Sequence, residues 1–308
     1  MSDALHRISA IIRTDILFRF RRTAALVTLL FVAAGVYFIV PDVRSGWALM
    51  VIEGHRVLYN SATVALGTGM FCAIFLSLIG FYVVSNSFRR DITSRVAFIL
   101  AATRVTNTEY IVGKFCGNLL YLTSIMFACM LSAMVMFLIR GEGPLQPVVF
   151  LATYLWLAIP PIVFCSAAAL AFESLPVLSG RFGDALFFIV WATFLGMSAS
   201  FYESKAGGGF LSALDIAGNL PVLEQLREHF HTQSMSIGWI SFDASRQPVL
   251  FSGLAWNPEM IGLRLMALII PAALLGWRFI DSIRRGSRRS LVTHRGISLP
   301  ESTESSSH

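Results

Sequence analysis

Six long apolar stretches, separated by loops whose arginine content alternates, constrain this chain more than any other feature. They cover residues 24–40, 62–85, 115–139, 148–172, 185–202 and 261–280. A helix needs about 20 mostly apolar residues to cross the hydrocarbon core of a membrane, and in lipid only helices and closed barrels satisfy every backbone group. Because the apolar residues run continuously and do not alternate, the sequence predicts an all-α polytopic membrane protein with six transmembrane helices.

The distribution of basic residues predicts the orientation. Of the lysines and arginines, 17 lie in the N-terminal segment, in the loops 86–114 and 173–184 and in the tail from Arg278, whereas 7 lie on the other side. Basic residues are retained in the cytoplasm, so we expect both termini inside, and an even number of spans requires the same. The segment 203–258 between spans five and six is then expected to face outward.

Composition agrees with a membrane protein and argues against a nucleic-acid partner. Hydrophobic residues make up 56% of the 308 and charged residues 14%, which is unusual for a soluble domain. The net charge of +6 comes from basic residues that collect beside the span ends, where they meet anionic lipid. The four cysteines fall inside spans without metal-ligand spacing, so we expect packing residues and no metal site.

Residues 1–23 are expected to form a cytoplasmic helix in the membrane interface. Apolar residues recur at helical spacing and arginines supply a cationic complement for lipid headgroups; the two sets are Leu5, Ile8, Ile12, Ile16 and Phe20, and Arg7, Arg13, Arg19, Arg21 and Arg22. A basic anchor that only sets topology is the alternative. Residues 24–281 would form the six-span domain, followed by a basic and then disordered cytoplasmic tail over 282–308.

The outward segment 203–258 is expected to contain a short helix opened by Asn219 and Pro221. Asn257 would cap the last span. Arg264, about 9 Å along that span at 1.5 Å per residue, would extend back to the outer surface.

The loop 86–114 is longer than a simple connection requires. It has a charged opening, a short apolar patch over 96–100 and a polar stretch that ends in Gly113-Lys114. This pattern favours a short amphipathic helix that presents a surface to something in the cytoplasm. A solvated extension of the neighbouring helices is the alternative.

The layout and this loop resemble the permease subunit of ABC type-2 exporters. The matching residues are Arg90-Asp91, Leu100, Thr103, Glu109-Tyr110 and Gly113-Lys114. Two pairs common in that family are replaced by Thr93-Ser94 and Arg104-Val105, which leaves the substrate open. The resemblance implies that the loop docks on a cytoplasmic ABC ATPase, present in two copies, and that a second permease copy completes a homodimer or heterodimer. The implied ATPase-coupling residues are Arg89, Arg90, Asp91, Arg95, Phe98, Leu100, Thr103, Glu109, Tyr110, Gly113 and Lys114.

The chain is not expected to bind nucleotide itself. A P-loop requires GxxxxGK[ST], but Gly113-Lys114 is followed by Phe115, and Thr108 stands in place of the first glycine. ATP and Mg²⁺ would therefore belong to the partner, with no cofactor on this chain. We also expect no enzyme activity, because no Ser/His or paired-carboxylate constellation lies at membrane depth.

Two features of the spans bear on transport. Pro160-Pro161 predicts a kink in the fourth span, either static or a hinge. The first five spans contain no ionisable residue, which disfavours an ion-coupled carrier. By resemblance, the second and fifth spans line the pathway, with Ser77, Tyr82, Trp191, Thr193 and Met197 as candidates; helix packing is the alternative.

The expected function is ATP-driven export of a bulky or amphipathic substrate, and a non-transporting platform that acts on a protein outside the membrane is the second hypothesis.

Overall fold

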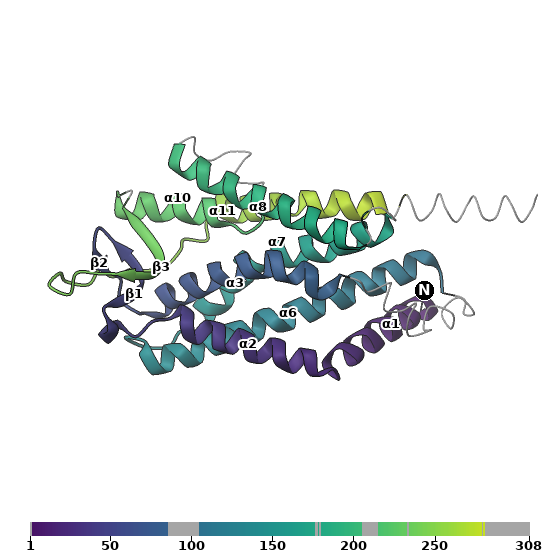
Figure 1. The fold of residues 1–308 in the computed structure, drawn as a ribbon, viewed down its shortest axis with the longest axis horizontal. Helices are drawn as coiled ribbons and strands as arrows, with labels where there is room; N and C mark the ends of the chain where they lie inside the picture. The colour runs from purple at the N-terminus through teal and green to yellow at the C-terminus, as the bar shows by residue number, and fades with distance from the viewer. Residues whose placement is uncertain are drawn as a thin grey trace, which may run out of the picture.

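The computed structural model describes residues 2–85, 105–175, 178, 180–204, 215–232, 234–278 and 280. Most of these residues are helical, as the sequence predicts, and the long helices lie side by side along the longest axis of the molecule (Figure 1). The predicted tail over 282–308 lies outside the described residues.

Four helices are long and apolar enough to cross a membrane. They are α3 (Ser61–Val84), α6 (Asn107–Arg140), α7 (Pro147–Ser174) and the helix over Pro258–Arg278, whose first part is α11 (Pro258–Met266). A fifth candidate is the bent pair of α1 (Ser2–Phe20) and α2 (Thr23–Ile39). The predicted fifth span, 185–202, falls within α8 (Arg181–Ser204). Since α8 is not among the candidates found in the described residues, the membrane-spanning character agrees with the prediction but six spans are not confirmed.

The N-terminal helix meets the first predicted span at a sharp corner. The axes of α1 and α2 differ by 71°, and Arg21 and Arg22 lie exposed at the corner. A bend of this size allows α1 to lie along a membrane surface while α2 enters it. The interfacial position of α1 stays a prediction.

A small antiparallel sheet departs from the predicted all-helical architecture. Its strand order is β2-β1-β3, with β1 at Trp47–Ile52, β2 at His55–Arg56 and β3 at Met235–Ser241. Glu53 and Gly54 join the first two strands with positive φ angles of 50° and 82°, as two-residue hairpin turns require. The central strand is buried because it packs on α3, where a Cβ on Gly67 would lie 2.7 Å from the Leu49 side chain.

The loops predicted to share one face of the membrane do lie together. β1 pairs with β3, and Arg56 forms an ion pair with Glu142 at 2.9 Å. These contacts join three predicted outward segments at the end of the bundle opposite the N-terminus (Figure 1). Relative sidedness is therefore as predicted, whereas the direction in which the bundle crosses the membrane stays a prediction.

The predicted short helix and the predicted cap of the last span are both present in the outward segment. Helix α10 (Asn219–Phe230) begins at Asn219, with Leu220 and Leu226 buried. The Asn257 side chain caps α11 by accepting from the Met260 N–H at 2.9 Å.

The core is centred on α3, which packs between α6 and α7 with most of its residues buried. Gly69 and Gly80 face α7, where a Cβ on either would make ordinary van der Waals contact with a side chain at 3.4–3.6 Å. Cys72, Cys129 and Cys165 are free and buried, in agreement with the predicted packing role.

Candidate functional site

Helix α1 packs along the first half of α6 through two glycines. A Cβ on Gly113 would lie 2.7 Å from Cγ2 of Ile11, and one on Gly117 would lie 3.0 Å from Oδ2 of Asp15. Small residues four apart let two helix backbones approach closely. The resemblance assigns Gly113 to an ATPase-coupling surface. In the structure Gly113 is buried, and Ile11 of α1 occupies the space beside it.

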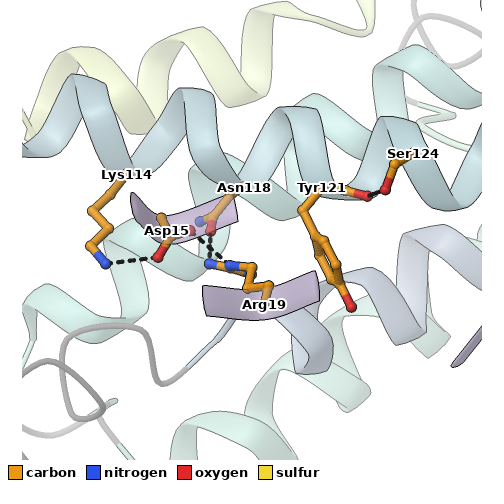
Figure 2. A network of polar contacts seen from close by, with 6 residues as sticks. All are labelled: Asp15, Arg19, Lys114, Asn118, Tyr121 and Ser124. Atoms are coloured by element: carbon orange, nitrogen blue, oxygen red, sulfur yellow. Dashed lines mark hydrogen bonds and ion pairs between the residues drawn. The ribbon is translucent and has the colours of Figure 1, made fainter. Parts of the chain in front are cut away.

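Buried charged side chains join the two helices where they approach (Figure 2). One carboxylate oxygen of Asp15 accepts from Nζ of Lys114 at 2.9 Å, and the other accepts from Nε of Arg19 at 2.7 Å. All three side chains are 3–5% exposed. Buried charges persist when they are paired and hydrogen-bonded, so this arrangement fixes the spacing of α1 and α6.

Arg19 also reaches two further residues of α6. Its Nη2 donates to Oδ1 of Asn118 at 2.5 Å, and its guanidinium carbon lies 5.2 Å from the centre of the Tyr121 ring, a geometry that allows a cation–π attraction. Arg19 was expected among lipid headgroups. That expectation is wrong, because the guanidinium is buried between the two helices.

A second contact lies one helical turn beyond the glycines. Arg7 forms a bidentate pair with Glu109, at 2.6 Å and 3.2 Å. Glu109 also accepts from the Thr106 N–H, while the Thr106 hydroxyl accepts from the Glu109 N–H; this reciprocal capping box satisfies free donors at the start of α6. Arg7, too, therefore contacts protein and not only headgroups.

We refer to these contacts as the α1–α6 clasp, whose members are Arg7, Asp15, Arg19, Glu109, Lys114 and Asn118. Positions 7, 11, 15 and 19 of α1 share one helix face at a spacing of four residues. The clasp therefore holds α1 and the first half of α6 as one unit. The signal for it was in the sequence: Asp15 is an acidic residue in the middle of a basic helix, four residues before Arg19.

Four of the predicted coupling residues are described. Glu109 and Lys114 belong to the clasp, Gly113 faces α1, and Tyr110 is half-buried with its ring 5.7 Å from Nζ of Lys114. The other seven, Arg89, Arg90, Asp91, Arg95, Phe98, Leu100 and Thr103, lie outside the described residues.

The candidate pathway residues divide into two groups. Trp191 donates from its indole nitrogen to the Ser77 hydroxyl at 2.7 Å, and the Tyr82 hydroxyl donates to the carbonyl of Asp184 at 2.8 Å; these contacts join α3 to α8 within one chain. Thr193 and Met197 are exposed on α8. Thr193 donates to the carbonyl of Ile189.

Arg264 was expected to extend back to the outer surface, but its side chain is buried. It is 1% exposed and donates to the carbonyls of Trp156 and Leu157 at 3.0 Å and 3.3 Å. These carbonyls lie four residues before Pro160 and Pro161, which have no N–H to complete the helical hydrogen bonds. The guanidinium therefore supplies the donors that the proline pair removes from α7.

The same guanidinium holds the turn that precedes α10. It donates to the carbonyls of Asp215 and Ile216, both at 2.9 Å. Gly218 adopts a φ of +78°, and a Cβ there would lie 2.6 Å from the guanidinium carbon, so both backbone conformation and space require glycine. Arg264 thus connects α11, the proline-containing part of α7 and the turn at 215–218.

No protein-family model, curated protein or solved structure matches this chain. Its function is therefore argued from the geometry above together with the sequence pattern.

Proposed function

We propose that this chain is the permease subunit of an ABC exporter in a bacterial cytoplasmic membrane. A separate cytoplasmic ATPase would hydrolyse ATP, and a dimer of permeases with two ATPases would move a bulky or amphipathic substrate outward. The α1–α6 clasp is the observation that carries this proposal, together with the resemblance of the loop 86–114.

The clasp gives the loop a mechanical connection to the membrane helices. The loop continues directly into α6, whose first turn is fixed by the capping box and by Arg7. A displacement of the loop would act on α1 and α6 together, because separating them would break the buried contacts of Lys114 with Asp15 and of Arg19 with Asn118. Rigid-body movement of packed helices is a common route from a binding event to a conformational change.

The positions of the helix ends favour an ATPase docking site at one end of the bundle. The N-terminus of α1 and the start of α6 lie at the same end of the bundle, opposite the sheet (Figure 1). Both of these helix ends belong to the sequence segments that hold 17 of the 24 lysines and arginines, and this excess favours the cytoplasm. The partner would dock there, on the loop 86–104 and the adjoining clasp.

Copurification of the partner tests this proposal. Replacing Phe98 and Leu100 with Asp should abolish copurification of an ABC ATPase with the tagged chain while membrane insertion remains normal. The matched control replaces Trp239 and Leu250 with Asp, which introduces the same two charges at positions near the sheet that are 52% and 62% exposed. Equal recovery of the ATPase with all variants would refute docking on this loop.

A platform that acts on a protein outside the membrane is the second candidate. The observation in its favour is that the end of the bundle with the sheet exposes large apolar side chains. Trp47, Trp239 and Leu250 are all at least 40% exposed there. Replacing these three with Ser distinguishes the two functions. An exporter should retain ATP-dependent release of its substrate from vesicles, whereas a platform should retain ATPase activity and lose its effect on the external protein.

A further inference from the structure

A lateral groove lies between α2, α3 and α6. It has a volume of about 340 Å³ and is lined in part by Phe31, Gly35, Ile39, Phe75, Ile79 and Ile125. This volume falls at the lower end of the roughly 300–1,000 Å³ that ligand pockets occupy. The groove is separate from the α3–α8 contact that contains Ser77 and Trp191.

The chemistry of the lining selects an apolar ligand. Thr28 contributes the one hydroxyl among the lining residues, and this hydroxyl already donates to the carbonyl of Ala24 at 2.8 Å. Cys72 and Cys129 also line the groove, where thiols behave as small hydrophobic groups. A ligand with polar atoms along its length would lose its hydrogen bonds to water and gain none here.

The length of the groove matches one membrane leaflet. On α2 the lining runs from Thr28 to Ile39, about 16 Å at 1.5 Å per residue. On α3 it runs from Cys72 to Val83, which is the same length. Half of a hydrocarbon core of roughly 30 Å is about 15 Å, the depth that one lipid acyl chain fills.

Cationic side chains lie beyond one end of the groove. Arg22 precedes Thr28 by six residues, or about 9 Å along a helix. Arg21 and Arg22 are exposed, and neither forms an ion pair within the described part of the chain. The guanidinium of Arg22 lies 4.3 Å from the centre of the Phe18 ring, which holds it at the α1–α2 corner. Guanidinium groups bind phosphate oxygens with two parallel hydrogen bonds.

We propose that the groove binds one acyl chain of an anionic glycerophospholipid whose phosphate contacts Arg21 and Arg22. The apolar lining, the one-leaflet length and the adjacent cations together select this ligand. The site requires that the bundle lies in a membrane, and it does not depend on an ATPase partner.

Photolabelling with a defined lipid tests the acyl-chain site. The full chain is reconstituted in vesicles that contain phosphatidylglycerol with a photoactivatable group in the middle of one acyl chain, and labelled peptides are mapped after irradiation. Gly35→Leu should reduce labelling of α2 and α3 about tenfold, a change of about 1.4 kcal/mol in binding free energy. A Cβ at Gly35 meets no atom within 4 Å, so the larger side chain starts in open space and extends into the groove, and leucine forms helix better than glycine.

The matched control is Gly276→Leu, the same change in the last predicted span. Its Cβ also meets no atom within 4 Å, and Gly276 does not line the groove. Labelling of α2 and α3 should be unchanged in this variant. Equal labelling of the wild type and Gly35→Leu would overturn the site. If Gly35→Leu changed the dimer fraction without changing labelling, the groove would instead bind a second copy of the chain.

A headgroup comparison tests the arginines. Phosphatidylcholine with the same photoactivatable chain should label less than phosphatidylglycerol. Arg21→Gln with Arg22→Gln should remove most of this difference, since each arginine near an anionic surface strengthens binding about fivefold. Arg13→Gln, a change at an exposed arginine on α1, is the control and should preserve the difference. Equal labelling by the two lipids in the wild type would overturn the headgroup contact.

Discussion

Replacing Arg264 should destabilise the protein by an amount that depends on the proline pair in α7. Arg264→Met removes the donors of the Trp156 and Leu157 carbonyls, and Pro160 and Pro161 prevent the helix from replacing them. A buried polar group without a partner costs about 1–3 kcal/mol. The two carbonyls therefore predict a loss of about 2–6 kcal/mol in the free energy of unfolding.

The prolines provide a test of this mechanism. In a background of Pro160→Ala and Pro161→Ala, the alanine N–H groups can bond to the same two carbonyls. Arg264→Met should then cost at least about 2 kcal/mol less than it does in the wild type, because its remaining effect is the loss of the contacts to the turn at 215–218. Arg264→Lys keeps the charge but not the planar fork, so it measures how much of the effect comes from geometry.

The assay is the free energy of unfolding in mixed micelles titrated with a denaturing detergent, measured for the four members of the double-mutant cycle. Independent sites add to within about 0.5 kcal/mol. Additivity in this cycle would refute the assignment of Arg264 as the donor that compensates for the prolines. A coupling of at least about 2 kcal/mol would confirm it.

Two further predictions concern other charged groups. Asp15→Asn should lower the free energy of unfolding by about 3–5 kcal/mol, because it leaves two buried cations without their shared carboxylate; a loss below 1 kcal/mol in the same assay would contradict the clasp. Burial alone would raise the pKa of Glu142, but hydrogen bonds from Arg56 and the Tyr59 N–H hold that pKa below 4.5. Stability from this group is present above pH 4.5 and is lost as pH falls through the lower folded pKa. The unfolding temperature should therefore fall less steeply in acid for Glu142→Gln than for the wild type.

Periodicity and length predicted the long helices well, because continuous apolar runs have few structural solutions in a membrane. The cap at Asn257 and the helix after Gly218 also follow from local sequence. The sheet was missed because β1 and β3 are separated by more than 180 residues, and short apolar runs do not distinguish strand from helix. The local signal for it was Gly54 between two short apolar runs, since glycine readily adopts the positive φ that a two-residue hairpin turn requires.

The interpretation of individual charges was less reliable than that of the spans. Arg19 and Arg264 were assigned to lipid headgroups and to the outer surface, but both are buried. Span boundaries alone cannot show which backbone carbonyls lack a donor or which carboxylate lies across a helix contact. The relation between Arg264 and Pro160-Pro161 could have been suspected, since prolines in a span leave acceptors that some donor must satisfy.

Site-specific crosslinking from the loop 86–114 tests the central proposal most directly. A photoreactive amino acid at Phe98, activated in intact cells, should crosslink to a protein that contains a GxxxxGK[ST] peptide, identified by mass spectrometry. The same amino acid at Leu250, near the sheet, should not crosslink to that protein. Crosslinks from both positions to the same protein, or from Phe98 only to lipid or to proteins without a nucleotide-binding peptide, would contradict ATPase coupling through this loop.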